Sequence, residues 1–345
     1  MSRCLELAKL GAGNVSPNPM VGAVLVYNDR IIGEGYHQKY GEAHAEPNCI
    51  QQAVVNGYSD LISRSTLYVS LEPCVHFGKT PPCTDLILKN KIPSVIIGCR
   101  DPFKEVNGKG IEKLKDAGIE VGFGILEKEC KELNKRFLGF HTHHRPYIIL
   151  KWAQTLNQKI AGQGSDRLYI TNEFTNRIAH KWRSEEAAIL IGTNTALMDD
   201  PELTTRMWPG KNPVRLVVDM DLKLPSQLKI FDGRVKTIVF NTLKNGDAGN
   251  LSFYQVTEDV SLVHQIVNAL YQLKILSVMV EGGAKLLQSF IDEGMWDEAR
   301  VFTNEELVAN VGLNAPQFML ASKMGEEKIF DDKIEFFSPG HPSSS

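Results

Sequence analysis

The sequence lacks a continuous apolar segment of the roughly 18 residues needed to span a bilayer, and it lacks a large charge of either sign. Lysines and arginines number 38 against 41 aspartates and glutamates, which gives a formal net charge of -3. A general nucleic-acid binder needs a basic surface that this balance does not supply. Residues 1–10 have the pattern of a short amphipathic helix rather than of a secretion signal. We therefore expect a cytoplasmic protein whose partners include neither nucleic acid nor membrane.

Cysteine is also scarce, with 6 residues in a chain of 345. Disulfide frameworks are typical of small secreted chains, so metal binding or burial explains these thiols better. Only Cys74 and Cys83 lie in an unusual local context, each directly after a proline. The other thiols, which we expect to be packed in the interior, are Cys4, Cys49, Cys99 and Cys130.

The length and the 43% hydrophobic content indicate an ordinary globular protein with two domains. Strand-like and helix-like segments alternate in two series, which predicts a layered α/β sheet in each half. The run 138–146 interrupts the alternation, so we expect domains over 1–143 and 147–338. His141, His143 and His144 in this run would suit a metal, but an interdomain linker explains them more simply.

In the first half, Asn28-Asp29 between two β-branched runs predicts a hairpin. Strands are expected over 21–27, 31–36, 66–70, 94–99 and 119–121, and helices over 45–56, 84–90 and 111–117. In the second half, strands are expected over 147–151, 187–191, 214–218, 237–240 and 277–280, and helices over 172–183, 262–273 and 284–291.

The strongest chemical signal joins His44 to Cys74 and Cys83. One imidazole nitrogen and two thiolates suit Zn²⁺, and three protein ligands leave the fourth tetrahedral position for water, as in catalytic zinc sites. His44 and Cys83 each precede or open a predicted helix, so two helix N-termini would favour thiolates here. Each part alone is weak evidence, but the combination predicts a zinc centre.

Glu46 follows His44 at the start of the same predicted helix. Its carboxylate can approach the open metal position without being a ligand, which is the place for a group that moves protons. This arrangement predicts hydrolytic removal of an amino group from a ring carbon, as in the zinc nucleobase deaminases. Lys79 and Thr80, in the long loop between the cysteines, could hold a phosphate.

These motifs resemble the bifunctional riboflavin-biosynthesis family, in which a pyrimidine deaminase is fused to a reductase. The matching elements are Pro17-Asn18-Pro19-Met20-Val21-Gly22, Gly35-Tyr36-His37, His44-Ala45-Glu46, Leu71-Glu72-Pro73-Cys74 and Gly78-Lys79-Thr80-Pro81-Pro82-Cys83. The resemblance implies a cytidine-deaminase-like three-layer α/β fold, with zinc on His44, Cys74 and Cys83 and proton exchange by Glu46. It also implies a group of residues near the substrate, namely Asn18, His37, Lys79 and Thr80.

The second half lacks a Gly-x-Gly-x-x-Gly motif after a strand, so an ordinary Rossmann site is not expected. Gly11 and Gly13 follow a predicted helix, and the third glycine is missing. The notable feature is the turn Val280-Glu281-Gly282-Gly283-Ala284 between a predicted strand and a predicted helix. Glycines there free backbone N–H groups for a phosphate, although the turn geometry alone also favours glycine.

The reductase half of the same family resembles dihydrofolate reductase in fold and uses NADPH. The matching elements are Lys151-Trp152-Ala153, Tyr169-Ile170-Thr171, Lys181-Trp182-Arg183, Ile191-Gly192-Thr193-Asn194-Thr195, the segment 199–206 and Glu281-Gly282-Gly283. The nucleotide contacts implied by the resemblance are Ala153, Tyr169, Thr195, Asp199 and, for the phosphates, Gly283, Ala284, Lys285, Leu286, Leu287, Gln288 and Ser289. The implied substrate contacts are Arg167, Arg183, Leu203, Arg206 and Glu281. The arginines Arg183 and Arg206 would pair with the ribose phosphate.

A few positions depart from the family pattern. The family has Leu-Asp-Gly where this chain has Leu156-Asn157-Gln158, a serine at Arg167 and a tryptophan at Tyr169. Tyrosine can still stack on a ring. The change at Asn157 and Gln158 removes a carboxylate and a glycine near the nicotinamide end of the expected site.

The sequence thus predicts a two-step enzyme with Zn²⁺ and NADPH as cofactors and a small pyrimidine ribosyl phosphate as substrate. The first half would deaminate the diaminopyrimidine, and the second would reduce its ribosyl group to a ribityl chain. One alternative is a nucleic-acid cytosine or adenosine deaminase, which the net charge disfavours. Another is a deaminase joined to a reductase-like binding domain that no longer catalyses. Assembly into a homo-oligomer is left open.

Overall fold

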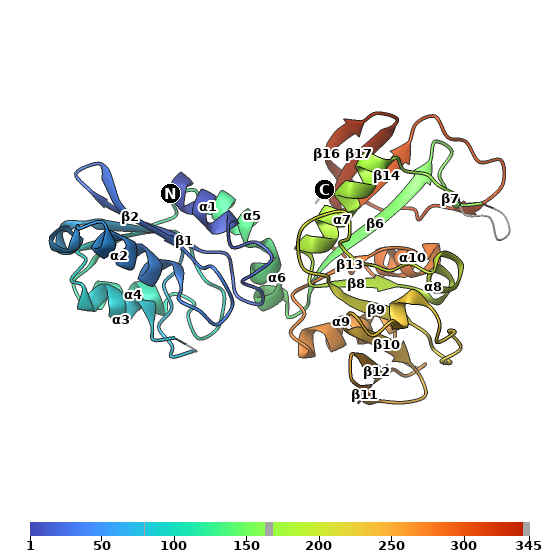
Figure 1. Ribbon diagram of the computed structural model, residues 1–345, viewed down its shortest axis with the longest axis horizontal. Coiled ribbons are helices and arrows are strands. Elements are labelled where there is room, and N and C mark those ends of the chain that lie inside the picture. The colour runs from blue at the N-terminus through green and yellow to red at the C-terminus, as the bar shows by residue number, and fades with distance from the viewer. Residues whose placement is uncertain (79, 163–167, 341–345) are drawn as a thin grey trace, which may run out of the picture. The chain divides into compact units, whose positions relative to one another are not determined.

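The computed structural model describes residues 1–78, 80–162 and 168–340. The chain forms two compact units, Met1–His144 and Arg145–Ser345, each built around its own sheet (Figure 1). Helices and strands alternate in both units, as the sequence predicts for an α/β protein.

The first unit has a mixed sheet. Its strands are β1 (Gly22–Tyr27), β2 (Arg30–Tyr36), β3 (Thr66–Leu71), β4 (Ser94–Cys99) and β5 (Glu120–Phe123). Its helices are α1 (Ser2–Lys9), α2 (Ala45–Val55), α3 (Cys83–Lys89), α4 (Lys109–Asp116), α5 (Glu127–Leu133) and α6 (Lys135–His143), with a 3-10 helix at Ser59–Arg64. The strand order is β2-β1-β3-β4-β5; β1 is antiparallel to β2 and β3, whereas β3, β4 and β5 are parallel.

The hairpin between β1 and β2 sets the register that builds the site. Asn28 and Asp29 both have positive φ, 46° and 59°, as a two-residue type I′ turn requires. Because β1 runs against both neighbours, the ends of β2, β3 and β4 and the start of β1 meet at one edge of the sheet. His37, Cys74 and Asn18 are therefore brought to that edge from distant parts of the sequence.

Both faces of this sheet are covered. Successive residues of a strand point to opposite faces, so Ala23 and Leu25 of β1 join the core beside α2, α3 and α4, while Val24 packs against α1. α1 contributes Cys4 and Leu7 to that second, smaller cluster. Helices on the two sides of the sheet can be followed in Figure 1. The unit thus has the three layers expected from the sequence.

The second unit has a larger sheet. Its main strands are β6 (Tyr147–Thr155), β8 (Ala188–Ile191), β9 (Val214–Val218), β10 (Thr237–Asn241), β11 (Gly246–Ala248), β12 (Leu251–Gln255), β13 (Ser277–Val280), β14 (Glu298–Asn304), β16 (Ala321–Ile329) and β17 (Asp332–Pro339). Their order is β11-β12-β10-β9-β8-β13-β6-β14-β17-β16, with parallel pairing from β12 to β14 and antiparallel pairing at both ends. The short strands β7 (Lys159–Ala161) and β15 (Leu313–Asn314) pair separately.

Helices cover both faces of the second sheet as well. They are α7 (Glu173–Glu185), α8 (Thr193–Asp199), α9 (Leu262–Gln272) and α10 (Ala284–Asp292), with a 3-10 helix at Lys229–Phe231. Ile148 and Leu150 of β6 share a core with α9 and α10, and Ile149 shares the opposite core with α7 and α8. Parallel strands buried on both faces read as continuous apolar runs, which is why the sequence pattern identifies them. In the described part of the chain, none of the helices combines the length and apolar character that crossing a bilayer requires.

The end of the first unit corrects the expectation of an irregular linker over 138–146. Residues through His143 are helical, as part of α6. Phe137 and Phe140 lie one turn apart and are buried, so an apolar face within the polar-looking run holds the helix against the unit. His141 packs edge-to-face on neighbouring phenylalanine rings, with the Phe137 centroid 4.6 Å away, and burial lowers the pKa of His141. This histidine is a packing residue.

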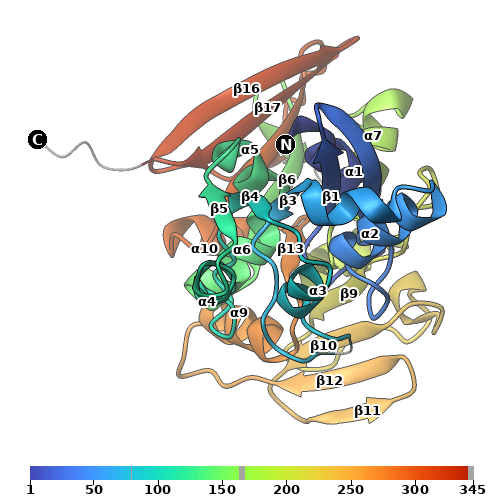
Figure 2. The ribbon, with the colours of Figure 1, turned by 90° about the vertical axis from the view of Figure 1, so that its left-hand side faces the viewer.

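A long hairpin of β16 and β17 closes one end of the second sheet (Figure 2). β17 pairs with β14 and places Ile334 in the core, whereas most side chains of β16 are exposed. The hairpin and β14 extend the sheet beyond the alternating series that the sequence predicts.

Candidate active sites

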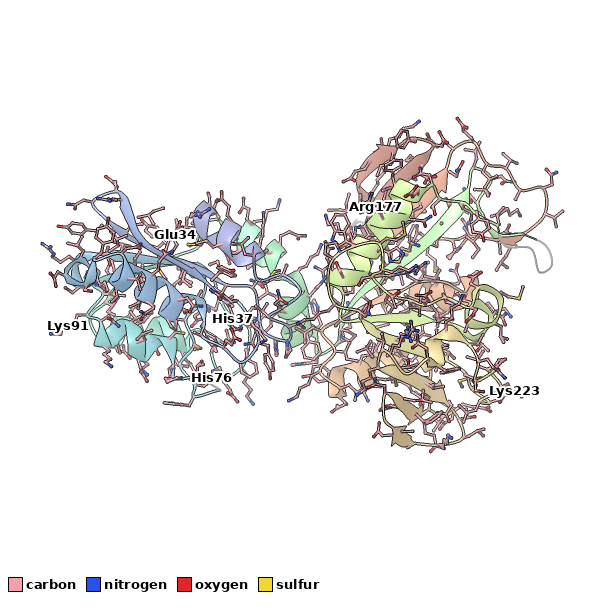
Figure 3. All side chains as sticks on the ribbon, in the orientation of Figure 1. Glu34, His37, His76, Lys91, Arg177 and Lys223 are labelled. Carbon is pink, nitrogen blue, oxygen red and sulfur yellow. The ribbon has the colours of Figure 1, made fainter. Side chains whose placement is uncertain are left out.

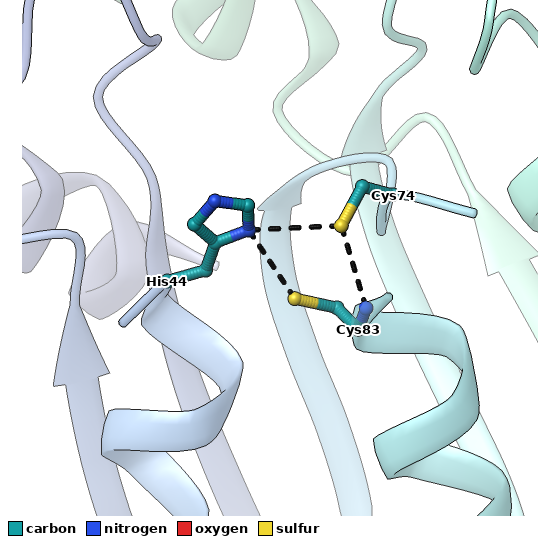
Figure 4. Close-up of side chains that lie close together, drawn as sticks. All are labelled: His44, Cys74 and Cys83. Carbon is teal, nitrogen blue, oxygen red and sulfur yellow. Dashed lines mark hydrogen bonds between the residues drawn. The ribbon is translucent and has the colours of Figure 1, made fainter. Parts of the chain in front are cut away.

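Three side chains of the first unit converge at the sheet edge where β2, β3 and β4 end (Figure 4). His44 Nδ1 lies 3.4 Å from the Cys83 sulfur and 3.6 Å from the Cys74 sulfur. A tetrahedral zinc ion with ordinary bond lengths holds nitrogen and sulfur ligands about 3.6 Å apart. Among the described residues, these form the one group of three or more His, Cys, Asp or Glu side chains whose ligand atoms all lie within 4.8 Å of one another. The donors and their spacing fit zinc.

Each of these donors stands at the end of an element. His44 is the N-cap of α2, Cys83 is the first residue of α3, and Cys74 follows β3. The Cys83 backbone N–H donates a hydrogen bond to the Cys74 sulfur at 3.3 Å. A helix N-terminus stabilises a thiolate in this way. The N-termini of α2 and α3 both lie at the site, as the sequence predicts.

Hydrogen bonding within the group favours a thiolate on Cys74. The pKa of Cys74 is lowered well below its usual value, because Cys83 and His44 hydrogen-bond to its sulfur. The pKa of the Cys83 thiol is raised, because that thiol gives the hydrogen bond to Cys74 and is buried beside Glu46. The contact with Cys74 also raises the pKa of His44.

Glu46 is buried beside the three donors, with 3% of its surface exposed. It lies in the first turn of α2, directly after the His44 cap. Burial, with a further contribution from the negative charge of Cys74, raises the pKa of the Glu46 carboxyl. A raised pKa favours the protonated carboxyl beside the three donors. The proton exchange expected of Glu46 stays a prediction.

His37 and Asn18, expected near the substrate, form a connected pair at the same edge. His37 Nδ1 lies 3.0 Å from the Ala43 carbonyl oxygen, and Asn18 Nδ2 lies 3.1 Å from His37 Nε2. Burial lowers the pKa of His37, and in the neutral ring Nδ1–H donates to Ala43 while Nε2 accepts from Asn18. The His37 ring packs edge-to-face against His44, with centroids 5.2 Å apart. The pair is thereby fixed beside the metal-ligand candidates.

The loop between the cysteines is described except at Lys79, which, like Arg167 of the second unit, lies outside the described residues. Thr80 is half-buried, and its carbonyl oxygen accepts a hydrogen bond from the Gly78 N–H at 3.3 Å. Its contact with a substrate stays a prediction. His76 in this loop (Figure 3) has no role from the sequence motifs. Its ring lies 5.6 Å from that of Phe103, and its Nδ1 is buried without a hydrogen-bond partner among the described residues.

In the second unit, the carboxylate of Glu281, directly after β13, contacts two basic side chains. They are Arg183 of α7 and Lys151 of β6. Arg183 donates to both Glu281 oxygens, from Nε at 2.8 Å and from Nη2 at 2.7 Å, and Lys151 Nζ lies 3.8 Å from Glu281 Oε2. Burial alone would raise the pKa of Glu281, but the two cations outweigh it and lower the pKa to about 2. The cluster has a net positive charge at the carboxyl end of parallel strands, where open α/β sheets bind ligands.

Lys151 is a candidate site residue that the sequence motifs leave without a role. Its neighbours Ile148, Ile149 and Leu150 are fully buried, and a lysine continuing such an apolar run is the signal that could have identified it. Burial lowers the pKa of Lys151, as is common for lysines at functional sites. His180 on α7 is also buried, and among the described residues its Nδ1 has no hydrogen-bond partner. Burial and the neighbouring arginines lower its pKa to about 4.

Three residues expected to face the substrate have different surroundings. Arg183 is held by Glu281, whereas Arg206 is exposed. Arg206 is therefore the more accessible of the two arginines for a phosphate. Leu203 is 2% exposed, in the core with α7 and α8, so only its backbone could reach a substrate.

Gly282 and Gly283 form the turn between β13 and α10, with φ of 115° and 78°, a region that favours glycine. A Cβ at Gly282 would also lie 3.1 Å from the Thr195 methyl group on α8. The N-terminus of α10 and Thr195 therefore lie together, and the orphan N–H groups of a helix start suit a phosphate.

Of the residues Gly283–Ser289, which the sequence predicts to bind the nucleotide phosphates, the structure favours those in the first turn of α10. Leu287 is fully buried in the core, and its N–H donates to the Gly283 carbonyl oxygen at 3.0 Å. The Ser289 hydroxyl donates to the Lys285 carbonyl oxygen within α10, and the Gln288 side chain bonds to Asp292 and to both backbone groups of Gln317. The candidates that remain for a phosphate are the backbone groups of Gly283, Ala284, Lys285 and Leu286.

The other nucleotide-binding candidates come from separate elements around the same strand ends. Ala153 is half-buried in β6, and Thr195 and Asp199 belong to α8. Tyr169 is 77% exposed, and its contact with a nucleotide stays a prediction.

The structure explains the departure at position 157 but gives no reason for the glutamine at position 158. Asn157 Nδ2 donates to the Ala309 carbonyl oxygen at 2.8 Å, and Asn157 Oδ1 accepts from the Ala309 N–H at 3.2 Å. A carboxylate cannot donate, so asparagine suits this two-point contact. Gln158 has φ of 59°, in the left-handed region where glycine, the residue of the family pattern, is least strained.

Replacing Gln158 by glycine is expected to raise the free energy of unfolding by up to about 1 kcal/mol, because glycine relieves the left-handed backbone. Urea unfolding of the full chain measures this. Gln317→Ala is the control, since it removes the Gln317 Nε2 to Gln158 Oε1 hydrogen bond of 3.2 Å and leaves the backbone unchanged. A destabilised Gln158→Gly protein would show that the side-chain contact outweighs the backbone strain.

Two family models match the chain. The cytidine and deoxycytidylate deaminase zinc-binding region matches residues 1–99, and the RibD C-terminal domain matches residues 146–308. The first match contains His44, Cys74 and Cys83, and the second contains Lys151 and the Glu281 turn.

Named relatives cover nearly the whole chain. The riboflavin biosynthesis protein RibD of Aquifex aeolicus is 40% identical over 340 residues, 97% of this chain and 94% of the relative, and that of Bacillus amyloliquefaciens is 39% identical over 88% and 82%. A crystal structure from Thermotoga maritima, described as a diaminohydroxyphosphoribosylaminopyrimidine deaminase/5-amino-6-(5-phosphoribosylamino)uracil reductase, covers 98% of this chain and 97% of its own, with 37% identity and a TM-score of 0.89. These similarities confirm the resemblance and the fold class inferred from the sequence. With a zinc-type donor group in one unit and a RibD reductase-type domain in the other, the chain belongs to the RibD family of riboflavin biosynthesis proteins.

Proposed function

We propose that the chain catalyses two successive reactions on one pyrimidine ribosyl phosphate. The first unit hydrolyses an amino group of the diaminopyrimidine ring, giving a uracil and ammonia. The second unit reduces the ribosyl group to a ribityl chain with NADPH. The observation that carries this proposal is the meeting of His44, Cys74 and Cys83 with the buried carboxyl of Glu46, in a chain that also carries the RibD C-terminal domain.

In the first reaction, a zinc ion held by His44, Cys74 and Cys83 would lower the pKa of a water molecule to about 7 and so supply the nucleophile. Glu46 takes the proton from the attacking water on a carboxylate oxygen and returns it to the leaving nitrogen. The raised pKa of Glu46 suits this transfer. His37, held neutral between Ala43 and Asn18, orients the ring beside the metal ligands.

In the second reaction, NADPH supplies the hydride, and the first turn of α10 with Thr195 holds its phosphates. The Arg183–Glu281 pair fixes the position of the Lys151 ammonium group at the strand ends. Arg206 offers an exposed cation to the substrate phosphate.

The same proposal includes a cytoplasmic location and small molecules as the only substrates. Similarity over both units supports it against a nucleic-acid deaminase, which would have no use for the second unit. The left-handed glycines of the Glu281-Gly282-Gly283 turn and the buried Arg183–Glu281 pair support an intact reductase site in that unit.

Metal removal tests the division of labour. Dialysis against a chelator is expected to abolish ammonia release and to leave NADPH oxidation by the deaminated substrate unchanged, because all three ligand candidates belong to the first unit. Metal analysis of the untreated protein should give about one zinc ion per chain, and added zinc should restore deamination. Full deamination by the metal-depleted protein would refute the proposal, and loss of both activities would refute the division between the units.

A further inference from the structure

Glu72 is a buried carboxylate that the deamination chemistry does not use. It lies directly after β3 with 3% of its surface exposed. Glu72 Oε2 accepts hydrogen bonds from the N–H groups of Gly108 at 3.0 Å and Asp101 at 3.4 Å, and Oε1 accepts from those of Gly110 at 2.9 Å and Ile111 at 3.2 Å. Its partners are thus backbone groups of one segment, 101–111.

These donors include the start of a helix that has no cap of its own. The N-cap of α4 is Gly108, which offers no side chain, and Gly110 and Ile111 lie in the first turn. The N–H groups of a first turn have no partner inside the helix. Glu72 supplies the missing acceptor from a distant part of the sequence, and its negative charge complements the helix dipole.

The same segment touches the turn that carries Cys74. A Cβ at Gly110 would collide with the Pro73 carbonyl oxygen and would lie 3.0 Å from Glu72 Oε1. α4 therefore approaches the Pro73–Cys74 turn as closely as a helix backbone can. Glu72, which precedes this turn, is thus hydrogen-bonded to the same helix start that packs against Pro73.

The other end of the segment reaches the loop between the cysteines. The Phe103 N–H donates to Asp101 Oδ1 at 2.8 Å, and the Phe103 ring packs on His76 of that loop. Because Glu72 holds Asp101 and Gly108, it fixes both ends of the loop that carries Phe103.

We propose that Glu72 is a positioning residue for the metal centre, which holds the Cys74 turn against segment 101–111 and thereby keeps the Cys74 sulfur in ligand position. The inference rests on the zinc site of the proposed function. Glu72 acts through the backbone and touches neither metal nor substrate. Outer partners that orient a metal ligand typically contribute roughly 10–100-fold to metal affinity.

Glu72→Gln tests this in the full chain loaded with zinc. The variant keeps the shape of the side chain but turns one acceptor into an NH₂ donor that faces backbone N–H groups. Zinc transfer to a chromogenic chelator is expected to be roughly 10-fold faster or more. The visible absorption of the Co²⁺-substituted variant, which reports the thiolate geometry, is expected to shift, while NADPH oxidation stays unchanged.

Asp219→Asn is the matched control. Asp219 of the second unit is likewise 3% exposed and accepts two backbone N–H groups, from Lys223 at 3.0 Å and Leu224 at 2.9 Å. Its replacement should lower stability without changing zinc release or the cobalt spectrum. Gly110→Ala should also speed zinc release, because the added methyl group displaces the Pro73–Cys74 turn by steric contact and not by charge. This variant tests the positioning of Cys74 if Glu72→Gln does not fold.

Zinc release and a cobalt spectrum like those of the unaltered protein in either folded variant would overturn the inference. Equal acceleration in Asp219→Asn would overturn it too, because general destabilisation would then be the cause. Absence of zinc from the unaltered protein would overturn the proposed function itself, so the two failures are distinguishable.

Discussion

Replacing Glu46 by glutamine is expected to slow ammonia release by roughly 10²–10⁴-fold, the usual contribution of a general acid–base group. Glutamine fills the same buried space, so zinc should stay bound by His44, Cys74 and Cys83. The amide cannot take the proton of the attacking water, which is the physical reason for the loss. Ammonia release, zinc content and NADPH oxidation are measured on the same preparation.

Glu42→Gln is the control for this substitution. Glu42 is exposed in the loop before α2 and pairs with Lys39 at 3.5 Å, so its loss should leave ammonia release unchanged. NADPH oxidation of the deaminated substrate should be normal in both variants. Failure of both reactions in Glu46→Gln would mean that the units do not work separately.

Replacing Glu281 by glutamine is expected to abolish reduction and to destabilise the second unit by on the order of 3 kcal/mol. The substitution leaves Arg183 and Lys151 largely buried without their shared anion, and removing one partner of a buried pair has an effect of this size. The tryptophans report the second unit selectively, because all of them belong to it: Trp152, Trp182, Trp208 and Trp296. Urea unfolding followed by tryptophan fluorescence therefore measures the loss, and deamination should persist.

The pH dependence separates charge from packing in this variant. The pKa of Glu281 is about 2 in the folded chain against an ordinary 4.5. The pairing of its carboxylate therefore stabilises the folded chain fully above pH 4.5, and this stabilisation is lost as the pH falls toward 2. The stability difference between the unaltered and Glu281→Gln proteins should therefore shrink over that window. Glu305→Gln, which removes the half-buried partner of the exposed Lys328, should have little effect at any pH, because solvent screens such a pair. Equal behaviour of the two variants would contradict the buried-cluster interpretation.

The metal centre could be predicted from the sequence because its chemistry lies in short motifs. His44 and Glu46 are two residues apart at a helix start, and one loop connects Cys74 to Cys83, so residue types and order already indicate zinc. The strand 214–218 is likewise predicted with the bounds that the structure shows, since a run that is apolar except at Arg215 marks a parallel strand buried on both faces.

Other elements could not be predicted because their stability comes from distant parts of the chain. β16 has few apolar side chains and is a strand only because it pairs with β17. α6 is hidden in a histidine-rich run whose buried face is a pair of phenylalanines. These segments lack the hydrophobic period that local sequence reasoning needs.

The hydrogen-bond and ion-pair networks around Glu281 and Glu72 could not be predicted for a related reason. Glu281 meets Arg183 and Lys151 only after strands and helices far apart in sequence assemble. Glu72 belongs to a matched motif, but its role becomes visible only when segment 101–111 folds against it. Partners separated by such lengths of chain leave no spacing signature.

The Asn28-Asp29 turn lies at the opposite end of β1 and β2 from His37. Strands of this length extend about 20 Å, so the turn is remote from every metal-ligand candidate. The geometry of the hairpin is the constraint on its two residues. A fluorophore or an immobilising peptide attached at this turn would therefore not disturb the metal-ligand candidates. The turn is a suitable attachment point for fixing the enzyme to a surface while both reactions are followed.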